Sequence, residues 1–380
     1  MRLKSLTFED KGTGWRLEDL KLDSFNLLVG ASGVGKTRIL LAILALNEIG
    51  RTGNTPSFNH GVRFDARFDL AGHSYTWQFE SAARAADSDE GSEPEGNGYF
   101  IVKEHLSVDG EKKPLVERMD DQFLFKGKAL PLLNRSVSAL LLLEEPVIEQ
   151  LKHAFAEQLS GVLGPPRAAL VVLETPSNLT KRFPTIEALS NRVRLNPIAK
   201  AFVLQEGFPD KFNDFKQRFI DIFPTVEDVS VSHEPTERLA HSSKEVLAFV
   251  IKERGTSIWI AASDISSGMG RTLHHIADLM LAPAGTVLLI DEFENSLGVN
   301  CMGPLTDLIL SRANELQFII TSHHPYIINN IPKDYWKIVR RKGSTVRVTP
   351  ASEIAALQGP SSQDDFIRLL NSPEFEEGLG

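Results

Sequence analysis

The residues best able to do chemistry lie in one stretch near the start of the chain, which reads Gly-Ala-Ser-Gly-Val-Gly-Lys-Thr from Gly30 to Thr37. It fits the pattern Gly-x-x-x-x-Gly-Lys-[Ser/Thr] at every fixed position. Glycines let successive backbone N–H groups turn toward phosphate oxygens, Lys36 supplies a positive charge, and the Thr37 hydroxyl can coordinate Mg²⁺. The stretch therefore predicts a phosphate-binding loop for ATP and Mg²⁺. We assign Lys36 also to catalysis and Thr37 also to the metal. The residues expected to contact the nucleotide are Gly30, Ser32, Gly33, Gly35, Lys36 and Thr37.

Two neighbouring carboxylates, Asp291 and Glu292, follow the apolar run Val287 to Ile290. Such a run predicts a buried strand, which delivers both acids to the carboxyl edge of a sheet, where α/β folds bind ligands. Asp291 is expected to hold Mg²⁺, and Glu292 is placed to polarise the water that attacks the γ-phosphate. Together with the phosphate-binding loop, this pair predicts a Mg²⁺-dependent ATPase.

Two shorter segments flank the carboxylate pair. Ser266, Ser267 and Gly268 open an expected helix, so hydroxyls and N–H groups gather at a helix end that can bind phosphate. After the pair, the next apolar run ends with His323 and His324. We do not favour a metal site built from these histidines and the pair at 274–275, because no cysteine or acidic cluster accompanies them.

The elements that must position these residues alternate between helix and strand. The sequence predicts strands at 25–29, 286–290 and 317–321, and helices at 37–48, 268–281 and 302–314. This alternation indicates a parallel sheet. Paired runs at 2–8 with 15–22, at 62–70 with 74–79 and at 246–253 with 257–261 indicate antiparallel hairpins. Phe8 and Trp15, in the first of these hairpins, could lie against a nucleotide base, although core packing is favoured.

A β-rich lobe and a helical segment separate the two ends of the expected site. Strand-like runs continue at 99–108 and 115–125, and helical patterns cover 132–163 and 197–223, the latter with a stripe of phenylalanines that predicts core packing. The expected fold is α/β, with a mixed and parallel sheet, a flanking antiparallel β lobe and a helical insertion lobe. The expected divisions are residues 1–130, 131–240 and 241–380.

Composition limits the classes of function. The chain has 41 Lys and Arg against 50 Asp and Glu, a formal charge of -9, which does not indicate a nucleic-acid partner. Its apolar runs are too short to span a bilayer, so we expect no membrane partner and a cytoplasmic protein. The single Cys301 excludes an internal disulfide. The acidic segment Ala82 to Asn97 lacks large apolar residues and is expected to be a flexible loop that proteases cut first.

The order of these motifs resembles that of ABC-type ATPases, specifically the branch that includes SMC, RecF and overcoming-lysogenization-defect proteins. The resemblance implies that the segment 266–268 is a signature motif, that Asn295 to Gly298 occupies the D-loop place, and that His323 is a catalytic switch residue. His324 stands where relatives have serine. For the glutamine of the Q-loop, Gln122 and the stretch Asn134 to Ser136 are the candidates.

The insertion indicates which members of this branch are most similar. It is longer than transporter ATPases need and lacks heptads for an SMC arm, and the segment after Pro325 is too short for the Toprim nuclease of overcoming-lysogenization-defect proteins. The chain thus resembles stand-alone ATPases of anti-phage systems such as PARIS, Septu and retron-associated systems. This implies ATP-sandwiched homodimers or higher oligomers that work with a separately encoded effector, such as a nuclease. The alternatives are a RecF-like DNA repair ATPase and an ATP-binding scaffold with negligible turnover.

Overall fold

The computed structural model describes residues 1–53, 60–83, 99–119, 122–131, 134–162, 169–172, 176–234, 245–354, 357 and 367–369. They belong to two compact units. The first comprises Met1–Gly161, Val287–Asp291 and the chain from Gln317 onward, and the second comprises Val162–Thr286 and Glu292–Leu316. Each unit combines stretches that are separate in the sequence, whereas the three expected divisions are continuous stretches of chain. The three-part division therefore stays a prediction.

A large mixed sheet organises the first unit, and 14 of its strands lie in the described part of the chain. Its central strands β15, β16, β3 and β17 are parallel. Every residue of β3, β15 and β16 is buried, as expected for strands covered on both faces. In order across the sheet, the strands are β10 (Leu159–Val162), β15 (Val287–Ile290), β16 (Gln317–Thr321), β3 (Phe25–Val29), β17 (Trp336–Lys342), β18 (Thr345–Pro350), β2 (Trp15–Lys21), β1 (Arg2–Asp10), β4 (Val62–Leu70), β5 (His73–Ala83), β6 (Tyr99–Val108), β7 (Val116–Met119), β8 (Gln122–Phe125) and β9 (Lys128–Ala129).

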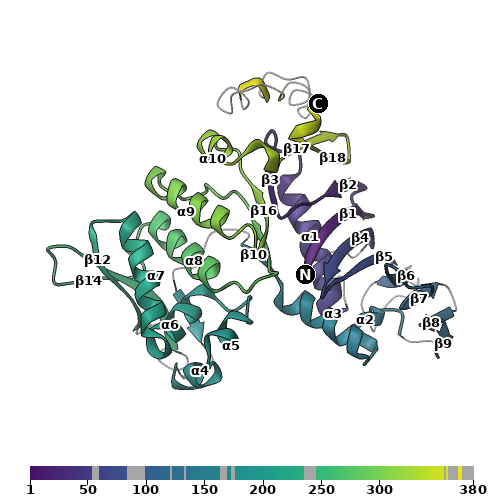
Figure 1. Cartoon of the computed structure of the whole chain (residues 1–380), viewed down its shortest axis with the longest axis horizontal. Helices are drawn as coiled ribbons and strands as arrows, with labels where there is room; N and C mark the ends of the chain where they lie inside the picture. The colour runs from purple at the N-terminus through teal and green to yellow at the C-terminus, as the bar shows by residue number, and fades with distance from the viewer. Residues whose placement is uncertain are drawn as a thin grey trace, which may run out of the picture. The chain divides into compact units, whose positions relative to one another are not determined.

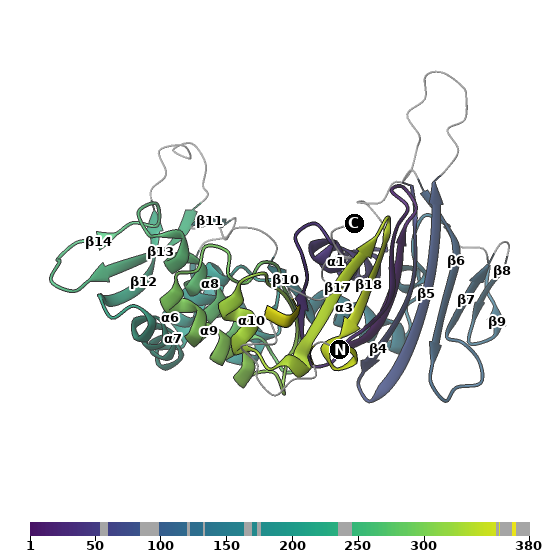
Figure 2. The ribbon, with the colours of Figure 1, turned by 90° about the horizontal axis from the view of Figure 1, so that it is seen from above.

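From β2 to β9 neighbouring strands are antiparallel. Strands β1, β4 and β5 alternate buried with more exposed residues. Helices α1 (Lys36–Thr52) and α3 (Pro146–Glu157) lie on the buried face of this sheet (Figures 1 and 2). Phe155 of α3 packs against Phe68 and Trp77, with ring centroids 5.5 and 5.4 Å apart. A Cβ at Gly50 of α1 would lie 2.5 Å from the Phe155 ring, so this glycine lets the two helices approach closely.

One expectation for this unit was wrong. The sequence predicted helix through residue 163, but the helical segments α2 (Ala139–Leu142) and α3 are followed by strand β10. The Val287 N–H donates to the Gln158 carbonyl at 2.8 Å, where β10 joins β15. A strand this short takes its conformation from a partner far along the chain, which local periodicity does not reveal.

The second unit combines a small antiparallel sheet with helices. Its sheet has the order β11 (Ala169–Val172), β13 (Glu245–Glu253) and β12 (Val226–Glu234), and β14 (Trp259–Ile260) also pairs with β13. Phe215 of the predicted phenylalanine stripe stacks on Phe249 of β13 with centroids 6.0 Å apart, so the stripe forms core. The helices are α4 (Pro176–Arg182), α5 (Ile186–Ser190), α6 (Pro197–Gly207), α7 (Pro209–Ile222), α8 (Ser267–Leu281) and α9 (Val299–Ser311) (Figure 1).

Strand β12 ends the small sheet, and side chains cover its free edge. The Gln205 side chain of α6 accepts a hydrogen bond from the Val231 N–H at 2.8 Å and donates to the Val231 carbonyl at 3.1 Å. The Val229 N–H donates to Asp228 Oδ1 at 2.8 Å. Gln205 thus takes the place that a residue of a further strand would have.

The predicted α/β class, with a mixed sheet, an antiparallel β lobe and a helix-rich insertion, is confirmed, and the insertion also carries the small sheet. The acidic segment expected to be flexible lies, from residue 84 onward, outside the described residues. Among the described helices, none combines the length and apolar character that crossing a membrane requires.

Candidate nucleotide site

The predicted phosphate-binding loop connects β3 to α1 in the first unit. Its backbone needs glycine at several positions: Gly33 and Gly35 have φ of 83° and 105°, which side-chain-bearing residues rarely adopt. At Gly30, a Cβ would lie 2.6 Å from the Val339 carbonyl oxygen of β17, so the neighbouring strand excludes a side chain there. Ser32 is exposed near the tip of the loop.

Lys36 is the first residue of α1, and its side chain lies over the loop. Its Nζ donates to the carbonyl oxygens of Gly30 at 2.8 Å and Ala31 at 2.9 Å. These contacts hold the ammonium group among the backbone groups that the sequence assigns to phosphate binding. Because phosphate oxygens are stronger acceptors than peptide carbonyls, an anion in the loop would compete for the same donor.

Thr37 and Asp291, the two predicted metal ligands, are brought together. Thr37 Oγ1 donates to Asp291 Oδ1 at 3.2 Å, although β15 and α1 are far apart in sequence. Hydroxyl and carboxylate oxygens suit Mg²⁺, which usually takes one or two carboxylates together with nucleotide phosphates. Among the described residues, no cluster of three or more His, Cys, Asp or Glu could hold a metal. The Thr37 hydroxyl and the Asp291 carboxylate are oxygen donors that fit Mg²⁺ bound to a nucleotide.

Thr321, at the end of β16, also contacts Asp291, and the sequence did not assign it a role. Its fully buried hydroxyl donates to Asp291 Oδ1 at 2.7 Å. Strands β15 and β16 are parallel, with Ile290 opposite Ile320. The next residues, Asp291 and Thr321, therefore lie side by side. The available signal was a hydroxyl residue at the end of an apolar strand that neighbours the Asp291 strand.

Replacing Thr321 with valine is expected to raise the Mg²⁺ concentration needed for half-maximal ATP binding about tenfold, as is usual when a group that orients a metal ligand is lost. Valine keeps the shape of threonine but cannot donate to Asp291. Titration calorimetry with ATP at several Mg²⁺ concentrations measures the effect. Thr321→Ser retains the hydroxyl and serves as the control. If Thr321→Val has the Mg²⁺ dependence of the wild type, Thr321 does not orient the ligand.

Glu292 follows Asp291 directly and begins the second stretch of the second unit. It is exposed and has φ of 43°, a left-handed conformation that costs a residue with a side chain about 1 kcal/mol or more. The Asn295 amide donates to the Glu292 carboxylate at 3.3 Å. The Asn295 N–H donates to the Glu292 carbonyl at 2.7 Å, which closes a turn. The segment in the D-loop place thus holds the predicted catalytic carboxylate.

Arg271 of α8 holds the backbone of the same residue. Its guanidinium is 1% exposed and donates from Nη2 to the Glu292 carbonyl at 3.2 Å. Arg271 Nε donates to His275 Nε2 at 3.4 Å. Burial and the nearby Arg271 charge lower the pKa of His275 to about 3, so this imidazole stays neutral and can accept. An arginine on the apolar face of the predicted helix was the available signal in the sequence.

The predicted signature residues lie at the start of α8. Ser266 Oγ accepts a hydrogen bond from the Met269 N–H at 3.2 Å and so caps the helix, while Ser267 is exposed. A Cβ at Gly268 would lie 2.8 Å from the Ser296 carbonyl oxygen. Glycine at this position therefore lets the signature segment and the D-loop segment touch.

The histidines after β16 have different surroundings. His323 is exposed at the edge of the sheet where Asp291 and Thr321 meet. His324 Nδ1 accepts from the Tyr326 N–H at 3.2 Å and caps the short helix α10 (Pro325–Asn330). His324 thus accepts at a helix N-cap, a position that serine also commonly occupies. The catalytic role of His323 stays a prediction.

Neither candidate for the Q-loop lies near the phosphate-binding loop. Gln122 is on β8, nine places from β3 in the strand order, or about 40 Å at the usual strand spacing. The stretch Asn134 to Ser136 precedes Ser138, whose N–H donates to the Gly53 carbonyl at 3.0 Å. Gly53 caps the far end of α1, about 25 Å of helix from the loop. Both guesses were therefore wrong.

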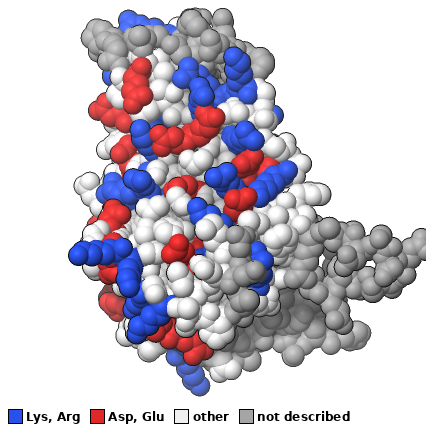
Figure 3. Space-filling view, turned by 90° about the vertical axis from the view of Figure 1, so that its right-hand side faces the viewer, with Lys and Arg blue, Asp and Glu red and all other residues white. Residues whose placement is uncertain are grey.

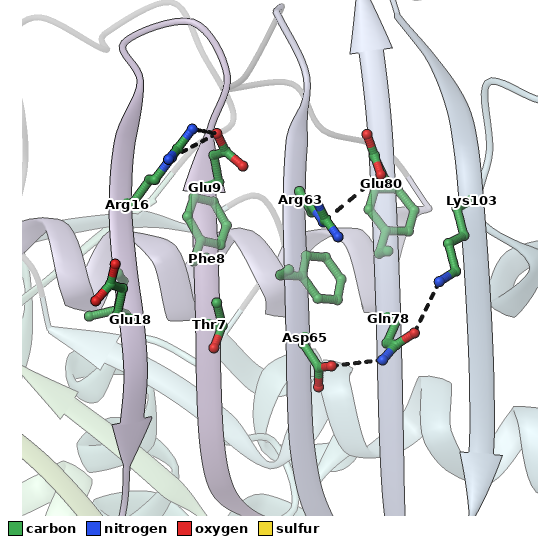
Figure 4. A pocket seen from close by; sticks show the side chains of 13 residues that line it. Thr7, Phe8, Glu9, Arg16, Glu18, Arg63, Asp65, Gln78, Glu80 and Lys103 are labelled. Atoms are coloured by element: carbon green, nitrogen blue, oxygen red, sulfur yellow. Dashed lines mark hydrogen bonds and ion pairs between the residues drawn. The ribbon is translucent and has the colours of Figure 1, made fainter. Parts of the chain in front are cut away.

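A polar cavity of about 600 Å³ lies on the exposed face of the antiparallel sheet, away from the loop (Figure 4). Its charges alternate across the strands: Arg16 pairs with Glu9 at 2.9 Å, and Arg63 with Glu80 at 4.0 Å. Figure 3 shows Lys and Arg interspersed with Asp and Glu over the described part of that side of the molecule. Since these charges largely neutralise one another, we assign the cavity no ligand.

The chain was compared in sequence with protein families and with curated proteins. A model of the protein family AAA_21, described as "AAA domain, putative AbiEii toxin, Type IV TA system", matches residues 25–329. No curated protein matches the chain in sequence.

Three solved structures of SMC heads resemble the chain. An SMC head bound to the C-terminal winged-helix domain of ScpA is 14% identical, with a TM-score of 0.51 over 92% of this chain and 97% of that one. The SMC head of Thermotoga maritima is 13% identical, with a TM-score of 0.42 over 92% of this chain and 99% of that one. The third, a head with an extended coiled coil bound to the C-terminal domain of ScpA derived from Pyrococcus furiosus, is 13% identical, with a TM-score of 0.45 over 92% and 96% of the chains. The first of these likenesses shows that the fold is that of an SMC-type head.

Proposed function

Because the chain belongs to the AAA_21 family of P-loop NTPases and has the fold of an SMC head, we propose that it is a Mg²⁺-dependent ATPase. The observation that carries the proposal is the contact of Thr37 and Thr321 with Asp291, beside the loop that holds Lys36. A carboxylate held by two hydroxyls next to a phosphate-binding loop is suited to Mg²⁺ bound to a nucleotide.

In this proposal the chain's own residues have distinct tasks. The loop N–H groups and Lys36 bind the β- and γ-phosphates, and Thr37 and Asp291 hold the ion that neutralises them. Glu292 orients and deprotonates the attacking water. Asn295 holds the Glu292 carboxylate, and Arg271 holds its backbone carbonyl. His323 contacts the γ-phosphate from the neighbouring strand.

We propose further that two copies close on two ATP molecules, with the signature segment of each copy on the γ-phosphate of the other. The start of α8 presents the exposed Ser267 hydroxyl at the positive end of the helix dipole, which favours an anion. ATP then supplies charge that both copies bind, and hydrolysis removes the shared contact. Nucleotide occupancy would thereby shift the population between open and closed pairs.

The ATPase is proposed to act as a nucleotide-gated sensor or scaffold for a separately encoded effector, such as a nuclease, in defence against phage. Two similarities support a partner of this kind: the AAA_21 family is described as a toxin of a toxin–antitoxin system, and the similar SMC head is bound to a domain of ScpA. The alternating charges of the sheet face do not favour the alternative of RecF-like DNA binding.

Cross-linking tests the pairing. One preparation carries Ser266→Cys and another carries Ser32→Cys, both with Glu292→Gln to keep ATP intact. A short bismaleimide is expected to join them into a dimer when both preparations, ATP and Mg²⁺ are present. The native Cys301 is 1% exposed and gives little background.

Each preparation alone is the control, since it lacks the second thiol across the expected interface. Adding Ser267→Arg to the Ser266→Cys chain should abolish the cross-link by placing bulk and charge at the helix end. If the mixed preparations bind ATP yet give no cross-linked dimer, the ATP-sandwiched pair is refuted while the nucleotide site stands.

A further inference from the structure

A wall of side chains from the first hairpin lies directly beside the phosphate-binding loop. Trp15 of β2 is 2% exposed, and its Nε1 lies 3.5 Å from the position a Cβ of Gly35 would take. Phe8 of β1 packs against Trp15 with centroids 6.3 Å apart and is also buried. Neither aromatic ring, both considered for the nucleotide base on sequence grounds, therefore offers a free face to a ligand.

Arg38 of α1 covers Trp15 on its solvent side. Its guanidinium carbon lies over the Trp15 ring, 5.2 Å from the centroid, and its side chain is 38% exposed. Arg38 Nη2 donates to Thr13 Oγ1 at 3.0 Å and lies 3.6 Å from Asp10 Oδ2. Thr13 in turn donates to Asp10 at 2.5 Å. A long, otherwise mobile side chain is thus held in one place by three partners.

The position of Arg38 suits the part of a nucleotide that the loop does not bind. Arg38 follows Thr37 in the first turn of α1, at the end where the phosphates are bound in the proposed function. A nucleoside joined to those phosphates has an aromatic base, and a guanidinium is a planar cation that stacks on aromatic rings. A guanidinium already fixed over Trp15 loses little conformational freedom when a base binds its outer side.

We propose that Arg38, fixed by Trp15, Thr13 and Asp10, is the surface on which the base of the bound nucleoside triphosphate stacks. The inference rests on the proposed function, because it takes the loop to bind a nucleotide. It adds a contact that depends on the base and is independent of the phosphates.

Two ligands separate these contacts: the non-hydrolysable β,γ-imido analogue of ATP, and inorganic tripolyphosphate, which has no nucleoside. Titration calorimetry with Mg²⁺ gives both affinities for the wild type, Arg38→Ala and Arg38→Lys. Both variants are expected to bind the ATP analogue about tenfold more weakly. Their affinity for tripolyphosphate is expected to stay within about twofold of the wild type, since the loop is unchanged.

Arg38→Lys keeps the positive charge but lacks the planar guanidinium group, so it distinguishes stacking on the base from attraction to phosphate. Arg16→Ala is the matched control: Arg16 follows Trp15, is paired with Glu9 and faces the polar cavity. Thermal unfolding checks that each variant is folded. Three results would overturn the stacking role. They are an equal loss of affinity for both ligands in Arg38→Ala, wild-type affinity for the ATP analogue in Arg38→Lys, and wild-type affinity for it in both variants. A wild type that binds neither ligand would overturn the proposed function and this inference with it.

Trp15 supplies an independent readout. Among the residues that the structure describes, its buried indole N–H has no hydrogen-bond acceptor, and it lies against the loop. Nucleotide binding is therefore expected to change its fluorescence. In a chain where the other three tryptophans are replaced by phenylalanine, the ATP analogue should alter the emission more than tripolyphosphate does. Equal changes with both ligands would contradict a base beside Arg38.

Discussion

Replacing Glu292 with glutamine is expected to lower ATP turnover about a thousandfold, which is the order of effect that a positioned general base contributes. Glutamine keeps the shape and the contact with Asn295 but cannot take a proton from water. ATP should bind as tightly as to the wild type, because the residues proposed to bind phosphate and Mg²⁺ are intact. Single-turnover kinetics and equilibrium binding of ATP measure the two effects separately.

Glu315→Gln provides the comparison for this variant. Glu315 lies in the same unit, is exposed and pairs with Arg312 at 3.0 Å, so the change alters charge at a distance from the motifs. It should leave turnover unchanged. Glu292→Gln with wild-type turnover would mean that another group activates the water, and a loss of ATP binding would give Glu292 a structural role instead.

Replacing Lys36 with alanine is expected to weaken ATP binding by about a hundredfold or more and to remove measurable turnover, because charged hydrogen bonds to phosphate are lost. The fold should survive, since the bonds from Lys36 to the Gly30 and Ala31 carbonyl oxygens lie within its own loop. Calorimetry with ATP and Mg²⁺ measures the affinity, and thermal unfolding without nucleotide checks the fold.

Lys4→Ala is the matched control for Lys36→Ala. Lys4 is also in the first unit, and it pairs with Asp69 on the exposed face of the sheet at 3.1 Å. Its loss should change neither binding nor turnover. If ATP binds to Lys36→Ala as tightly as to the wild type, the assignment of the nucleotide site to this loop is wrong.

The features that the sequence predicted correctly are those whose pattern lies within one continuous stretch of chain. The loop, the strand before it and the helix after it form one continuous stretch, so their types and spacing were sufficient. The parallel strands near Asp291 were also predictable, because a buried parallel strand is a continuous apolar run. The β lobe followed from alternation within each strand.

The features that the sequence missed depend on which distant residues meet. Gln122 was a plausible glutamine in sequence, but the order of strands puts it nine places from β3. Thr321 contacts Asp291 and Arg271 contacts Glu292 only because strands pair and helices pack in the folded chain. The short strand β10 likewise owes its extended conformation to pairing with β15. Spacing along the chain contains none of this information.

The covered edge of β12 has a consequence for how copies of this chain associate. An open strand edge pairs readily with another open edge, including the same one in a second copy, and such a ribbon would form whether or not any ligand is bound. Here a ribbon through Val231 would first have to break both hydrogen bonds from Gln205. The permanent route to self-association is therefore disfavoured at this edge. The proposed pairing on ATP does not use this edge, so it can be reversed when ATP is hydrolysed.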